Sequence, residues 1–175
     1  MSSRLLVPIF FFFLSTGASS AFAAEEIKVN LPDATGEIAG PINDSRASIN
    51  AFSCAEIAKG WKADADVENF LKIGQRRGLR LLEWMEKSPQ DKLIKVGMNL
   101  AGFWNLNSQG KAVSKDFYLG RVSSDVSSFL NSKYLDSKLP QYPPKNTIEY
   151  LKNAESKLKK VREELFNEYQ CSKLK

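Results

Sequence analysis

Apolar residues recur at spacings of three and four through most of the chain after residue 52, and no segment alternates convincingly with a period of two. This pattern predicts helices. The longest is expected from Val67 to about Lys87, with the stripe Val67, Phe70, Gly74, Gly78, Leu81 and Met85. A glycine inside a helix costs about 1 kcal/mol relative to alanine, so its two glycines predict a second helix crossing very closely there.

Capping residues mark where the other helices begin. Ser53 with Glu56 has the spacing of a capping box and predicts a short leading helix to about Lys59, which Gly60 can end. Asp66 is expected to cap the long helix. Ser88 and Pro89 predict a third helix, to about Trp104, and Ser114 a fourth, to about Leu135.

A last helix is predicted from Thr147 to about Cys171, opened by Asn146 with Glu149 at the capping-box spacing. Its apolar residues form a narrow coiled-coil-like seam of Leu151, Ala154, Leu158, Val161 and Leu165. The chain is therefore predicted to be all-α. Four main helices and the short leading helix form one helical domain over residues 52–175.

Residues 24–51 lack a sustained period and contain Pro32, Gly36, Gly40 and Pro41, so we expect an extended, flexible N-terminal arm. The arm holds two basic and five acidic residues, whereas residues 53–175 hold 22 basic and 15 acidic ones. An acidic arm could fold back onto a basic body, although salt weakens such long-range attraction.

Residues 1–23 have the features of a cleaved secretory signal peptide. Arg4 precedes the apolar run from Leu5 to Leu14, and the small residues Ala21 and Ala23 form a cleavage site. The alternative is a membrane anchor, but the run has half the length that a spanning helix needs. We therefore expect a periplasmic or secreted protein without an integral membrane segment after cleavage.

The only two cysteines, Cys54 and Cys171, are expected to form a disulfide, because exported proteins fold in an oxidising compartment. Closing a loop of this length stabilises a fold by up to about 5 kcal/mol in the chain-entropy model. Free thiols or an intermolecular bridge are the alternatives.

The chain contains no histidine, which excludes histidine-based triads and histidine metal ligands. Two cysteines are too few for a four-cysteine zinc site, and there is no glycine-rich phosphate loop, calcium loop or dinucleotide motif. We expect no cofactor, no metal and no enzyme activity. Glu83 and Glu86, beside Trp84, leave a carboxylate-pair hydrolase formally open, although two solvated charges explain them as well.

The candidate partner-binding residues are Lys72, Arg76 and Arg80, spaced by four, with Arg77 alongside. Such a basic stripe can bind an acidic partner, anionic polysaccharide or lipid headgroups, or it can be the solvated back of an amphipathic helix. Nucleic acid is disfavoured by the expected export. A second candidate is an aromatic set, for which core packing is the alternative. Its members are Phe103, Trp104, Phe117 and Tyr118.

The sequence Phe52-Ser53-Cys54-Ala55-Glu56-Ile57 resembles the start of HdeA-type periplasmic acid-stress chaperones, although this chain is longer and more basic and its cysteines are farther apart. The sequence Asp116-Phe117-Tyr118-Leu119-Gly120 is similar to a helix of small immunity proteins that neutralise secreted effectors. Both resemblances imply a non-enzymatic protein that presents a helical surface to other proteins.

The sequence therefore predicts an exported helical protein-binding protein that acts as a chaperone, an inhibitor or an assembly partner. Another protein is the expected partner, and a homodimer is possible. The alternatives are a carboxylate-based hydrolase acting on cell-wall or exported polysaccharide, and a small-ligand carrier with a cavity between its helices.

Overall fold

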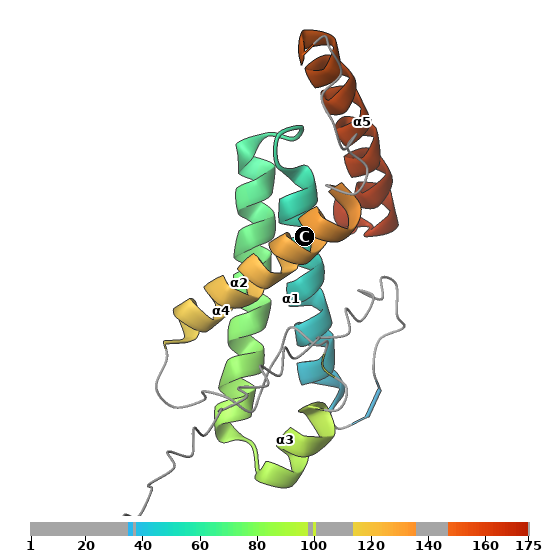
Figure 1. The fold of residues 1–175 in the computed structure, drawn as a ribbon. Coiled ribbons are helices and arrows are strands. Elements are labelled where there is room, and N and C mark those ends of the chain that lie inside the picture. Colours follow the sequence, from blue (N-terminus) through green and yellow to red (C-terminus); the bar gives the residue numbers. More distant parts are fainter. Residues whose placement is uncertain (1–34, 37, 98–99, 101–113, 136–146, 175) are drawn as a thin grey trace, which may run out of the picture.

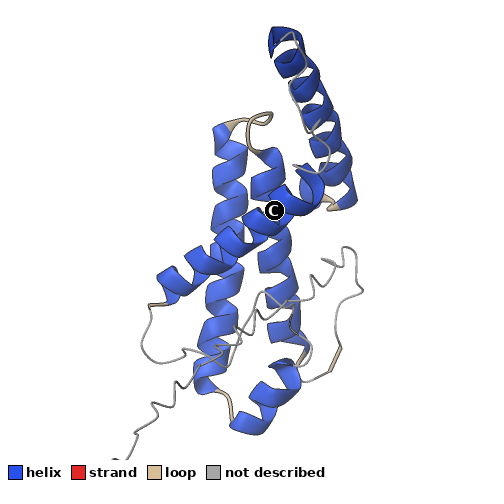
Figure 2. Cartoon of the chain, viewed as in Figure 1, coloured by secondary structure: helices blue, strands red, loops and turns tan. Residues whose placement is uncertain are grey.

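The computed structural model describes residues 35–36, 38–97, 100, 114–135 and 147–174, and all regular structure within them is helical (Figures 1 and 2). The predicted all-α class is therefore confirmed. The helices are α1 (Ala39–Ala58), α2 (Asp64–Lys87), α3 (Gln90–Gly97), α4 (Lys115–Leu130) and α5 (Thr147–Glu168); the π-helical turn η1 (Asn131–Leu135) extends α4, and the 3-10 turn η3 (Cys171–Lys173) follows α5.

Helix α1 is the centre of the fold. It forms an antiparallel hairpin with α2, and α4 crosses the hairpin diagonally (Figure 1). All eight residues of its last two turns, 51–58, are buried, so this end of the helix is covered on every side. The short α3 lies at the far end of the hairpin from the α1–α2 turn (Figure 1). The turn contains Gly60, whose φ of +78° suits glycine.

The predicted close crossing on α2 is present at Gly74. A Cβ atom on this residue would lie 2.6 Å from two ring atoms of Phe52 on α1, closer than real Cβ contacts come. The Ser48 hydroxyl donates a hydrogen bond of 2.7 Å to the Gly74 carbonyl oxygen from the same side. Gly74 therefore lets the two backbones approach until a side chain of α1 can bond directly to the backbone of α2.

The predicted arm is wrong from Ala39 onward, because residues 39–51 are the first part of α1. The leading helix is therefore 20 residues long instead of short. Pro41 lies in the first turn of α1. A backbone N–H at this place has no acceptor within the helix, so its absence in proline costs no hydrogen bond. The side chains that face the protein here include the buried Ser45 and Ser48. Residues 1–34, with the predicted signal peptide, lie outside the described residues.

Two predicted helix caps are also corrected. Ser53 lies inside α1, and its buried hydroxyl makes no hydrogen bond to the described residues, so Ser53 and Glu56 do not form a capping box. Helix α2 begins at Asp64, before the predicted cap Asp66. At the start of α4 the prediction is confirmed, because the Ser114 hydroxyl accepts a hydrogen bond from the Phe117 N–H.

The predicted disulfide between Cys54 and Cys171 is present, and both cysteines are fully buried. It joins the C-terminal part of the central helix to the turn after α5, with 5.5 Å between the Cα atoms. The seam of α5 is buried at Leu165 near this anchor and exposed at Leu151 near the other end. The rest of the helical domain, which we call the body, therefore holds α5 by the C-terminal half of that helix. The N-terminal half of α5 extends past the α1–α2 turn (Figure 1).

Replacing Gly74 with alanine should destabilise the protein, because the new methyl group would overlap the Phe52 ring. We expect the free energy of unfolding to fall by about 1–3 kcal/mol, measured by denaturant titration. Gly120→Ala is the matched control: this exposed helical glycine on α4 has nothing within 4 Å of a Cβ, so the change should stabilise the helix slightly. Equal effects of the two substitutions would contradict the close crossing.

Removing the disulfide by the double substitution Cys54→Ala and Cys171→Ala should lower the free energy of unfolding by several kcal/mol, with about 5 kcal/mol as the upper value for so long a loop. The mature protein, unfolded without reductant, should show no free thiol on titration. Two reactive thiols in that sample would contradict the bridge.

Candidate functional site

The four predicted partner-binding residues all lie on α2, and the structure connects two of them to α1. Arg77 and Arg80 donate hydrogen bonds of 3.0 and 2.8 Å to the same carboxylate oxygen, Oδ1 of Asp44. The Asp44 side chain is 18% exposed, whereas that of Arg80 is 50% exposed. A largely covered acid on the central helix therefore holds two guanidinium groups at the surface of α2.

The other two residues of this set are more exposed. Lys72 forms an ion pair of 2.7 Å with Glu68, one helical turn earlier. Both side chains are well exposed, and an exposed pair of this kind contributes little to stability. Arg76 is exposed and makes no ion pair with any described residue. We use the name basic face of α2 for Lys72, Arg76, Arg77 and Arg80.

The basic face is therefore only partly neutralised. Asp44 and Glu68 provide two negative charges against four positive ones. Each arginine has five N–H donors, and the bond to Asp44 uses a single one of the donors of Arg77 and of Arg80. The remaining donors suit the carboxylates of a partner, since arginine binds planar carboxylates in a bidentate manner.

A buried carboxylate that sequence reasoning assigned to a helix cap connects α1 to α4. Glu56 is 6% exposed. Its Oε2 accepts hydrogen bonds from Ser127 (2.7 Å) and Lys59 (2.5 Å), and its Oε1 accepts one from Asn131 (3.1 Å). Burial acts to raise the pKa of Glu56, but these hydrogen bonds and the Lys59 charge outweigh it and hold the pKa below the ordinary value of 4.5.

Helix α5 meets the same end of α1 through Arg162. Its guanidinium donates to the backbone carbonyls of Glu56 and Ile57, at 2.5 and 3.0 Å. These are among the last carbonyls of α1, which have no partner inside the helix and carry the negative end of its dipole. Burial lowers the pKa of Arg162, although the charge of Glu56 opposes this. Arg162 therefore acts as a C-terminal cap that is supplied by another helix.

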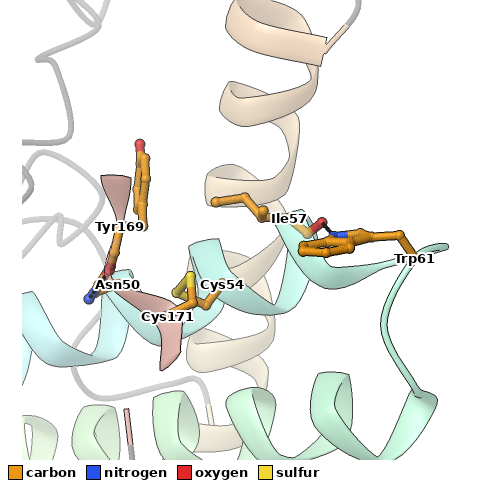
Figure 3. The surroundings of a disulfide bond; sticks show 6 residues. All are labelled: Asn50, Cys54, Ile57, Trp61, Tyr169 and Cys171. Atoms are coloured by element: carbon orange, nitrogen blue, oxygen red, sulfur yellow. Dashed lines mark hydrogen bonds between the residues drawn. A yellow bond between two sulfur atoms is a disulfide. The ribbon is translucent and has the colours of Figure 1, made fainter. Parts of the chain in front are cut away.

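Figure 3 shows the disulfide between α1 and the turn after α5, with the side chains around it. The Asn50 side-chain amide donates a hydrogen bond of 3.2 Å to the backbone carbonyl of Tyr169. The residue Tyr169 is almost fully buried. The Trp61 indole N–H donates to the Ile57 carbonyl at 2.6 Å. The disulfide region therefore serves to hold helices together.

The remaining sequence candidates do not come together as a site. Glu86 forms an ion pair of 2.8 Å with Lys115 on α4, so this member of the possible carboxylate pair has a cationic partner. Phe117 is 61% exposed on the first turn of α4, and Tyr118 packs partly against the core. Phe103 and Trp104, the other members of the aromatic set, lie outside the described residues.

In the described part of the chain, no group of three acidic or cysteine side chains could hold a metal ion. No described helix has the length and apolar character needed to span a membrane. No family model, curated protein or solved structure matches the chain. The function is therefore inferred from the chemistry of the sequence and of the described surfaces.

The sequence indicates the basic face, but it does not indicate that Asp44 holds two of its arginines or that Glu56 and Arg162 connect the end of α1 to α4 and α5. The sequence pattern places Asp44 in the predicted arm, and the capping-box spacing explains Glu56. Arg162 lies among several charged residues of an amphipathic helix, and no local pattern distinguishes it. Their roles depend on contacts between residues that are 33 to 106 positions apart.

Glu56→Gln should destabilise the protein by about 2–3 kcal/mol at neutral pH, because a buried, fully hydrogen-bonded carboxylate is replaced. Since the folded pKa is depressed, the stability from Glu56 is present above about pH 4.5 and is lost as the pH falls through the folded pKa. The difference between wild type and variant, measured by urea unfolding, should therefore narrow in acid. Glu68→Gln, at an exposed ion pair, is the control and should show no detectable change. A difference that is constant with pH would contradict this role.

Proposed function

We propose that this is an exported helical binding protein of the periplasm or a secreted space, which binds an acidic segment of another protein on the basic face of α2. The leader-like first 23 residues support export, and the buried disulfide is typical of proteins that fold in an oxidising compartment. No catalytic step is part of the proposal.

The observation that carries the proposal is the pair of arginines held by Asp44 beside the exposed Arg76. A flexible side chain loses conformational freedom when it binds, and this loss is reduced when the fold already fixes the side chain. Both arginines lie on α2, which is packed against α1, the helix of Asp44, through the close approach at Gly74. The basic face therefore offers donors in a fixed arrangement.

The length of the basic face favours a polypeptide over a small anion. Lys72 to Arg80 spans eight helical steps, which is about 12 Å along the axis. Several carboxylates spread along an extended or helical segment match this length. The net positive charge would also speed the encounter with an acidic partner, and salt would weaken that effect.

The proposal is tested by site-specific photo-cross-linking in cells, with the reactive group at the exposed position Gln75 next to Arg76. A discrete adduct with another protein should form in the exported fraction, and Arg76→Glu should reduce its yield strongly. Arg121→Glu, at an exposed arginine of α4, is the matched control and should leave the adduct unchanged.

The identity of the adducts distinguishes the kinds of binding protein. One stoichiometric partner would indicate an inhibitor or assembly role, a spread of unrelated proteins a chaperone, and an adduct of twice the mass a homodimer. The absence of any adduct, or equal loss in both charge reversals, would refute binding at the basic face.

A further inference from the structure

The N-terminal half of α5 carries an apolar surface outside the body. Ile148 and Leu151 are 69% and 59% exposed, and they are two of the three most exposed large hydrophobic residues in the described part of the chain. The body anchors the other half through the buried Leu165 and the disulfide at Cys171. Ala154, the next residue of the seam, is buried, so the exposed apolar part of α5 is limited to the first turn around Ile148 and Leu151.

Exposed lysines lie along the same part of α5. The segment from Ile148 to Lys160 holds four lysines and two glutamates, and the lysines are exposed. Successive spacings of four, three and four place Ile148, Lys152, Glu155 and Lys159 on one side of the helix. We use the name α5 arm for residues 148–160.

We propose that the α5 arm binds the surface of an anionic lipid bilayer. Ile148 and Leu151 would enter the headgroup layer, and Lys152 and Lys159 on the same side would reach the lipid phosphates with their long side chains. The charge complementarity is direct, because each lysine close to an anionic surface is attracted by it. The disulfide and Leu165 would keep the body attached to the bound arm.

The chemistry of the arm favours a lipid surface over an acidic protein. Its described cations are all lysines, which are compact, strongly hydrated charges on flexible stems. Such side chains adapt to mobile headgroups. The basic face of α2, by contrast, presents arginines fixed by Asp44, as recognition of a folded or extended protein segment requires.

The test is co-sedimentation of the full mature, disulfide-bonded protein with vesicles. It should sediment with phosphatidylcholine–phosphatidylglycerol vesicles, but not with phosphatidylcholine alone, and high salt should release it. The double change Lys152→Gln and Lys159→Gln should weaken binding by about fivefold per lysine. Ile148→Ser with Leu151→Ser should also weaken it. Glu155→Gln should strengthen binding, an effect that loss of folding cannot produce.

Matched controls separate the arm from total charge and total exposed apolar area. Lys87→Gln with Arg121→Gln removes two positive charges elsewhere, and Phe117→Ser removes an equally exposed apolar side chain on α4. Both should bind vesicles like wild type. No binding to anionic vesicles, or equal losses in arm and control variants, would overturn the proposal. Binding of poly-glutamate through the arm, without binding to vesicles, would replace the bilayer with an acidic polypeptide.

Discussion

The buried carboxylate of Glu56 is the interaction on which the meeting of the helices depends. A charge that is taken out of water is costly unless donors surround it. Lys59, directly after α1, supplies one donor, and Ser127 and Asn131 supply two from α4 and η1. These donors are in reach only when α4 crosses α1 at this level. The cost of an unsatisfied carboxylate therefore selects one packing of α4 among the many that apolar contacts alone would allow.

The same two turns of α1 also fix α5, by different chemistry. Arg162 binds the final carbonyls of α1, and Cys54 makes the covalent link to Cys171. The carbonyls attract a cation because they lie at the negative end of the helix dipole. The disulfide restricts how far Cys54 and Cys171 can separate when the chain unfolds. Polar, ionic and covalent contacts thus converge where α1 is completely buried.

Features that depend on local chemistry could be predicted from the sequence. The Ser114 cap, the turn at Gly60 and the pairing of the only two cysteines are of this kind. The close crossing at Gly74 was also predictable, because glycine inside a long helix costs energy that only a packed neighbour offsets. In each case the residue type, at its position in the sequence pattern, is commonly found in only one structural role.

The first half of α1 could not be predicted, because its helix is stabilised by burial and not by a local pattern. Ser45 and Ser48 face the protein interior, so the apolar period that normally identifies a helix is absent. Ser48 is instead suited to the close approach of α2, where its hydroxyl bonds to the Gly74 carbonyl. Missing this helix also concealed Asp44, and with it the reason that Arg77 and Arg80 are held together.

The distribution of charge limits what the two proposed surfaces can bind. The acids that lie in or beside the basic face of α2 neutralise half of its charge, and the α5 arm keeps an excess of lysine. Both surfaces remain positive, so like charge opposes the pairing of either one with the same surface of a second copy. Their difference lies in rigidity: Asp44 fixes the arginines on a packed hairpin, whereas the lysines extend from a helix that the body holds at one end. A fixed set of donors suits a defined array of carboxylates and mobile cations suit a fluid anionic layer, which is why different anions are proposed for the two surfaces.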